Sequence, residues 1–175
     1  VHLIKFNRNE QEPWDVIKAI KQQFKYNFDM ESARKVLLHV YEAMAKDHPG
    51  LFEKIHLTKQ QMREMVQMGH SLGVHTHSHI SVAWHDLDEA TQKKELLKPK
   101  DLLENAFNTS VRSFSYPFGG RQDCLATGQF LEKTHEYTYA FTVEPIVNDE
   151  QTSRFELGRH MPMSTDTVLK LKSVC

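Results

Sequence analysis

A chain of 175 residues is the size of one domain and is long enough to bury a hydrophobic core. Its 22 Lys and Arg stand against 23 Asp and Glu, and no basic block stands out, which argues against nucleic-acid binding. The longest apolar runs, such as "KVLLHVY", are too short to span a membrane, and the two cysteines, Cys124 and Cys175, do not make a disulfide framework.

The first 54 residues are expected to form a helical hairpin preceded by a weak strand, "HLIKF". Pro13 suits the first turn of a helix, and the apolar residues after it recur at helical spacing as far as Phe24. A second helix is expected after Asp29, a candidate N-cap. It should end at "DHPG", 47–50, because proline cannot continue the hydrogen-bond ladder.

From residue 55 onward, strands alternate with helices. Thr58 and Gln61 form a capping-box pattern ahead of a helix that Gly69 should stop. The later expected elements, in order, are a strand at 72–76, a helix at 86–107 with an Asp86/Glu89 start and a kink at Pro99, a strand running into a turn at 111–120, a helix at 124–133, strands at 137–143 and 154–163, and a helix near Thr165. This alternation predicts an α/β fold with a mainly parallel sheet, in which ligands collect at the carboxyl ends of strands.

A histidine cluster, "GVHTHSHIS" at 73–81, follows one of those strand ends. Neutral imidazole is a good ligand for zinc-like metals, and about three or four ligands complete a site. If the strand continued through the cluster, His75, His77 and His79 would share one face. If the chain became helical after Thr76, His75 and His79 would lie one turn apart on one face. The plain alternative is a solvated polar loop that is rich in histidine.

The stretch "MREMVQMGHSLGVHTHSH" resembles the second motif of the NodB-homology polysaccharide deacetylases, carbohydrate esterase family four. In that family a glycine–histidine lead precedes a His-Thr/Ser-x-x-His pair whose outer histidines bind a metal. The resemblance implies that His75 and His79 are metal ligands, with His77 at the variable middle position and His70 structural. It covers roughly residues 55–175, which would be the C-terminal part of a partial or distorted (β/α) barrel. The hairpin, 1–54, then looks like an insertion within one structural domain.

A second family signature, Arg, four residues, Pro and an aromatic, is matched by Arg112, Pro117 and Phe118. On its own, "SFSYPFGG" is a plain strand-to-turn junction, although its glycines would allow close approach of a substrate and its turn would present backbone N–H groups. The resemblance implies that the Phe118 N–H helps to hold an oxyanion and that Arg112 orients the catalytic base. The expected substrate-binding residues are Tyr116, Pro117 and Gly119. Aromatic side chains here and at Trp84 would either stack on sugar rings or simply pack.

The family's first motif, a strand ending in two adjacent aspartates that supply the base and a third metal ligand, is not found in this sequence. "NFDME" at 27–31 has one aspartate, but it joins two expected helices, where an N-cap is the simpler explanation. We therefore expect a chain that starts after the catalytic strand or a degenerate member of the family. The family's late histidine, the general acid, is best matched by His160 in "LGRHMPM". His135 is expected at the surface. In the shorter members of the family an arginine near this point is found more regularly than a histidine, and Arg159 matches it.

Two other interpretations stay open. Histidinol-phosphatase-like phosphoesterases (the PHP class) carry a His-x-His with a downstream serine, which "HTHSHIS" matches loosely. That class needs many later ligands, whereas the histidines after the cluster are His85, His135 and His160. A non-catalytic interaction module stapled by a metal is the other alternative, and a metal with no open coordination position would identify it.

The resemblance implies a divalent transition metal as cofactor, with zinc preferred, and an acetylated carbohydrate as substrate, with acetate and a free amino sugar as products. Residues 55–175 supply only about four expected strands where a closed barrel needs about eight, so we expect an uncovered sheet edge and self-association. The chain alone should bind metal weakly and lack deacetylase activity. No charged-then-apolar leader opens the sequence, which favours a cytoplasmic location, or an extracytoplasmic one after removal of a signal.

Overall fold

The computed structural model describes residues 13–161. The expected strand at 2–6, the end of the strand expected at 154–163 and the helix expected near Thr165 lie outside this range. The chain divides into two compact units, Val1–Leu57 and Thr58–Cys175. This division falls close to the boundary expected between 1–54 and 55–175. That residues 1–54 are an insertion remains a prediction. Each unit is described by itself.

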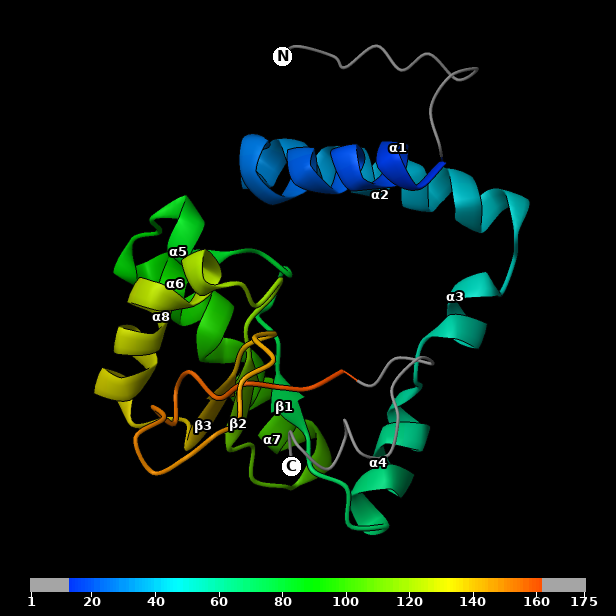
Figure 1. Cartoon of the computed structure of the whole chain (residues 1–175). Coiled ribbons are helices and arrows are strands. Elements are labelled where there is room, and N and C mark those ends of the chain that lie inside the picture. Colours follow the sequence, from blue (N-terminus) through cyan, green and yellow to red (C-terminus); the bar gives the residue numbers. More distant parts are fainter. Residues whose placement is uncertain (1–12, 162–175) are drawn as a thin grey trace, which may run out of the picture. The chain divides into compact units, whose positions relative to one another are not determined.

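The first unit is helical. Its elements are α1 (Pro13–Gln22), the π-helical turn η1 (Gln23–Asn27), α2 (Met30–Asp47) and α3 (Leu51–Ile55). Figure 1 shows the chain running out along α1 and back along α2. The expected N-cap is confirmed, because the Asp29 carboxylate accepts hydrogen bonds from the Ser32 N–H (2.8 Å) and the Ser32 hydroxyl (2.7 Å).

Among residues 13–57, the apolar side chains of the first unit do not form a buried core. No residue of its described helices is buried, and Trp14 and Leu37 are 77% and 56% exposed. The apolar face that predicted these helices is therefore left uncovered by the described residues of this unit. Nowhere in residues 13–161 does a helix combine the length and apolarity needed to cross a bilayer.

The second unit is an α/β layer structure with a small parallel sheet. Its elements are α4 (Lys59–Gln67), β1 (Gly73–Val74), α5 (Val82–His85), α6 (Glu89–Leu96), α7 (Lys98–Phe107), β2 (Ser113–Ser115), α8 (Arg121–Thr134) and β3 (Tyr139–Phe141). The strands lie side by side in the order β1-β2-β3, and both pairings are parallel, with Val74 opposite Phe114 and Phe114 opposite Ala140 (Figure 1). The predicted α/β class with a mainly parallel sheet is confirmed for this unit.

Local capping signals predicted both ends of α4. The Thr58/Gln61 capping box is confirmed: the Gln61 side chain accepts from the Thr58 N–H (2.8 Å), and the Thr58 hydroxyl accepts from the Gln61 N–H (3.2 Å). Gly69 follows α4 with φ +92°, a left-handed conformation that favours glycine and ends a helix.

The helix predicted over 86–107 is two helices, and its expected start is wrong. Asp86 has φ +46° and lies at the C-terminal cap of α5, whereas Asp88 caps α6 by accepting from the Thr91 N–H. The break falls between Leu96 and Lys98, because Pro99 has no N–H to donate to the carbonyl four residues earlier, that of Glu95. The short helix α5 was not predicted.

The strand predicted at 154–163 is reduced to one bridge, Phe141 to Leu157, within the described residues. Backbone hydrogen bonds nevertheless run along β3, with the Leu157 N–H donating to Ala140 O (3.0 Å) and the Thr142 N–H donating to Leu157 O (2.8 Å). This segment therefore covers the β3 side of the sheet, while β1 forms the other edge among the strands described.

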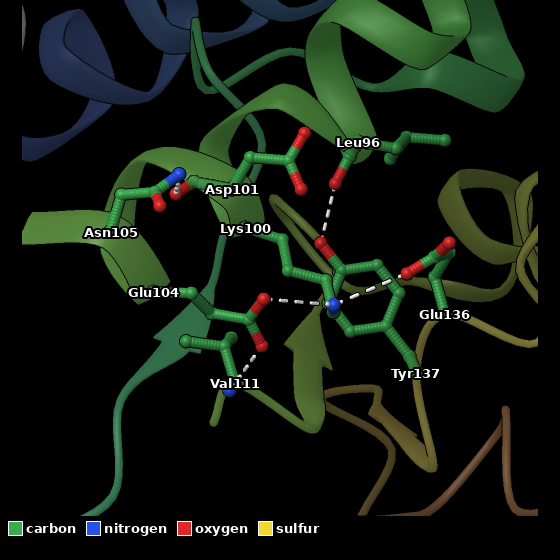
Figure 2. Close-up of polar contacts among 8 residues, drawn as sticks. All are labelled: Leu96, Lys100, Asp101, Glu104, Asn105, Val111, Glu136 and Tyr137. Carbon is green, nitrogen blue, oxygen red and sulfur yellow. Dashed lines mark hydrogen bonds and ion pairs between the residues drawn. The ribbon is translucent and has the colours of Figure 1, made fainter. Parts of the chain in front are cut away.

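Figure 2 shows the polar contacts that join the α6–α7 break to the rest of the second unit. Lys100 Nζ lies 3.2 Å from Glu104 and 3.1 Å from Glu136, and Glu104 also accepts from the Val111 N–H (2.9 Å), just before β2. The Tyr137 hydroxyl donates to the Leu96 carbonyl, which the helix break leaves without an intrahelical donor. These contacts fix the helix pair against β2 and against the connection into β3.

Tyr137→Phe is expected to lower the free energy of unfolding by about 1–3 kcal/mol, because the Leu96 carbonyl would stay buried without a donor. Tyr137 is 5% exposed and its ring packs edge-on against Phe114 (5.6 Å), so the ring itself should stay in place. Tyr139→Phe, at a residue 46% exposed, is the matched control and should leave stability unchanged. Urea unfolding followed by circular dichroism measures both, and equal stability of the two variants would contradict this account.

Candidate active site

Two loops at the carboxyl ends of neighbouring parallel strands form the site. His75 follows β1 directly, and the turn Tyr116–Gly120 follows β2. Because β1 and β2 are parallel and paired, their carboxyl ends meet at one edge of the sheet. The sheet therefore brings together the two motifs that the sequence analysis singled out.

His75 is oriented by the end of β2. Its Nδ1 lies 2.7 Å from the carbonyl oxygen of Ser115. A carbonyl can only accept, so Nδ1 carries the proton and Nε2 keeps its lone pair. An imidazole held in this way by a backbone carbonyl is set up to bind a metal through Nε2.

His79 reaches His75 through an irregular loop. The strand and the helix considered for this stretch are both wrong, since residues 75–79 form an exposed irregular loop, as the polar-loop alternative expected. Thr76 and His79 instead have φ +55° and +54°, which is strained for residues with a side chain. The rings of His75 and His79 nevertheless lie together, as the helical alternative expected, with their centroids 4.8 Å apart.

The ring of His79 also contacts Phe118 edge-on, at a centroid distance of 5.0 Å and an angle of 89°. Partial burial lowers the pKa of His79, and the repulsion that a protonated His75 would exert lowers it further. Both effects favour the neutral imidazole, which is the form that binds a metal.

The turn after β2 is fixed to the end of β3. Phe118 and Gly119 have φ +66° and +69°, and the Val143 N–H donates to the Gly119 carbonyl (3.0 Å). A Cβ added to Gly119 would lie 2.9 Å from the Val143 backbone nitrogen, so the close approach requires glycine. Pro117 is buried.

Tyr116 lies in the core in this structure, which is the packing alternative that the sequence left open. It is 1% exposed, its hydroxyl donates to the Phe155 carbonyl (2.7 Å), and its ring packs edge-on against Phe114 (5.2 Å). Burial strongly raises its pKa. Its ring has no exposed face for stacking on a sugar, so the expectation that it binds substrate is not supported by its position.

The other predicted residues lie around this edge or away from it. Arg112 precedes β2, at the end of the strand away from Ser115, and its carbonyl accepts from the Thr138 N–H (2.8 Å). Arg159 donates from Nε to the Thr142 carbonyl (2.7 Å), just after β3, which places the His160 segment near the carboxyl edge. His135 is exposed at the C-terminal cap of α8, as expected of a surface residue.

His75 and His79 fit two positions of a transition-metal site by the chemistry of their donors. Among residues 13–161, no group of three His, Cys, Asp or Glu side chains could hold a metal ion. Cys124 is buried, which raises its pKa to about 12, so its thiol stays protonated and is a poor ligand.

Sequence reasoning missed Glu95, which touches the loop between the two histidines. It is fully buried, and its carboxylate accepts from the N–H (2.8 Å) and the hydroxyl (2.9 Å) of Ser78. The sequence did contain one indication of this contact. Pro99, inside a helical pattern, leaves the Glu95 carbonyl without its helical donor, and this carbonyl accepts from the His77 N–H instead.

The chain belongs to the polysaccharide deacetylase family, whose family model, "Polysaccharide deacetylase", matches residues 30–140. The match begins within the first unit, upstream of the expected start at residue 55, and ends before His160. The Bacillus subtilis (strain 168) protein "Putative polysaccharide deacetylase YxkH" is 33% identical over 106 residues, which are 61% of this chain and 36% of YxkH. The chain thus spans about a third of the length of this relative.

Solved structures share the fold at low identity. The Streptococcus pyogenes deacetylase PplD, determined in complex with acetate, aligns with a TM-score of 0.58 and 21% identity over 75% of this chain and 54% of that one. A Bacillus cereus polysaccharide deacetylase aligns with a TM-score of 0.53 and 24% identity over 67% of this chain and 36% of that one. The family model and the Bacillus subtilis relative support the deacetylase interpretation, and none of the comparisons supports a PHP-type phosphoesterase.

Proposed function

We propose that this chain forms the metal-binding part of a hydrolase that removes acetyl groups from N-acetylated or O-acetylated carbohydrate. The observation that carries the proposal is the row of three rings, His75, His79 and Phe118, at the carboxyl edge of a parallel sheet in a member of this family. We further propose that the second unit is part of a distorted (β/α) barrel of the deacetylase type.

His75, through Nε2, and His79 would hold a divalent transition metal, with zinc preferred because imidazole suits it. When bound, such a metal lowers the pKa of a water ligand toward ~7 and polarises a carbonyl oxygen. The chain's own groups prepare the pair: the Ser115 carbonyl fixes the tautomer of His75, and partial burial lowers the pKa of His79, which favours its neutral form. The third ligand and the catalytic base would come from outside residues 13–161.

The turn after β2 would stabilise the oxyanion that forms when water attacks the acetyl carbonyl. The left-handed backbone at Phe118 and Gly119 and the contact of the Phe118 ring with His79 fix this turn beside the metal ligands. We assign the backbone N–H of Phe118 to the oxyanion, with Pro117 and Gly119 shaping the turn. His160, whose neighbour Arg159 is fixed at the end of β3, is the proposed general acid, and Arg112 the proposed partner of the base.

The experiment is acetate release from N-acetylated amino-sugar oligomers in the presence of zinc. We expect no turnover by the 175-residue chain, because its sequence lacks the family's pair of adjacent aspartates, and turnover by a form extended toward the length of YxkH. His75→Ala in the extended form should abolish the activity. Metal binding without acetate release by the extended form would contradict the proposed reaction. Turnover by the chain alone would assign the base to one of its own carboxylates, such as Asp86, and contradict the assigned site.

A further inference from the structure

The loop between the two histidines is held by one buried carboxylate. Glu95, near the end of α6, is 0% exposed, and its two carboxylate oxygens accept from the N–H (2.8 Å) and the hydroxyl (2.9 Å) of Ser78. Burying a carboxylate is costly unless it is hydrogen-bonded, so these two bonds matter to the position of Ser78. Ser78 directly precedes His79.

The backbone of Glu95 holds the same loop. Its carbonyl accepts from the His77 N–H (3.0 Å). That carbonyl is available because Pro99, four residues later, has no N–H to donate to it. The carboxylate and the carbonyl of Glu95 therefore accept three hydrogen bonds from Ser78 and His77, which lie 17 and 18 residues earlier in the sequence.

The loop at 75–79 requires stabilising contacts from outside itself. Thr76 and His79 both adopt left-handed φ values, which residues with a side chain keep only where their surroundings fix them. Inside the loop, the Ile80 N–H donates to the Thr76 hydroxyl at 3.3 Å, a long hydrogen bond. The bonds from Glu95 act on the two residues between these strained positions.

We propose that Glu95 is a positioning residue for the metal site, one that holds His77 and Ser78 so that the ring of His79 faces His75 and Phe118. This inference rests on the proposed function for its relevance to catalysis. Glu95 does not touch the histidine rings in any contact seen here and acts through the loop backbone.

The test compares Glu95→Ala with Glu95→Gln in the 175-residue chain. Alanine leaves the Ser78 N–H and hydroxyl without their partner. Glutamine can keep both bonds, because its amide oxygen accepts from the N–H and its amide nitrogen donates to the hydroxyl oxygen. Glu104→Ala is the matched control: Glu104 accepts a backbone N–H from Val111 in the same helix pair but contacts a different part of the chain.

Two readouts separate positioning from stability. Cobalt(II) titration followed by visible absorption should show a dissociation constant roughly 10–100-fold higher for Glu95→Ala, and near that of the unaltered chain for Glu95→Gln and Glu104→Ala. In the metal-free protein, the NMR cross-relaxation between the His79 and Phe118 rings should disappear in Glu95→Ala alone. Unchanged cobalt binding by folded Glu95→Ala, or an equal loss in Glu104→Ala, would overturn the proposal.

If Glu95→Ala does not fold, Ser78→Ala removes the hydroxyl bond alone and should weaken cobalt binding roughly 2–10-fold. Unchanged affinity in that variant would contradict the inference. If the unaltered chain binds no cobalt, the proposed function fails. The His79–Phe118 ring contact, measured by NMR in the metal-free variants, still decides whether Glu95 positions the loop.

Discussion

His75→Ala and His79→Ala, made together, are expected to lower the zinc affinity of the chain by at least about a hundredfold. Changing a residue that merely supports a ligand typically costs 10–100-fold, so removal of two direct ligands should exceed this. The measurement is zinc content by elemental analysis after dialysis, together with calorimetric titration. Because partial burial lowers the pKa of His79, this residue should remain a neutral ligand at a lower pH than an ordinary histidine.

The control is the double variant His77→Ala, His135→Ala, which removes two exposed imidazoles and leaves the pair intact. It should bind zinc like the unaltered chain. Equal zinc content in the His75/His79 variant and in the unaltered chain would contradict the metal site.

Gly119→Ala is expected to lower the free energy of unfolding by roughly 2–5 kcal/mol. The left-handed φ of +69° accounts for about 1–2 kcal/mol, and the added Cβ, 2.9 Å from the Val143 nitrogen and 2.7 Å from its Cγ1, for about 1–3 kcal/mol more. Both contacts join the turn after β2 to the end of β3, so the variant should also displace Phe118.

Gly69→Ala separates the two causes, because Gly69 also has a positive φ (+92°) but a Cβ there would meet nothing within 4 Å. Its free energy of unfolding should fall by about 1–2 kcal/mol, which is the cost of the left-handed backbone alone. Urea unfolding measures both variants. Equal losses would mean that the approach of Val143 to the turn does not require glycine.

Local hydrogen-bond chemistry in the sequence predicted the helix ends. The caps at Asp29 and Thr58 use side chains within three residues of the N–H groups that they satisfy, so the pattern is complete in a short stretch. The strands were harder, since β1 and β2 are two and three residues long and their pairing is decided by partners about forty positions away. The segment at 154–163 alternates like a strand, yet within the described residues it contributes one bridge.

The sequence indicated which three rings lie together at the candidate site, but not the loop geometry that brings them together. The resemblance pointed to His75, His79 and Phe118, and the structure brings their rings together. The loop that does so could not be predicted from spacing, because its course depends on a buried side chain from α6. Tyr116 shows the opposite difficulty: an aromatic residue in a motif looks available to a substrate until its hydroxyl is found bonded inside the core.

The metal position in a zinc-soaked crystal, located by anomalous diffraction at the zinc edge, tests the central claim most directly. We predict a peak bonded to Nε2 of His75 and to the ring of His79, beside the turn that carries Phe118, since Nδ1 of His75 is committed to the Ser115 carbonyl. A peak bonded to Nδ1 of His75, or zinc held elsewhere while this pair stays unbound, would contradict it.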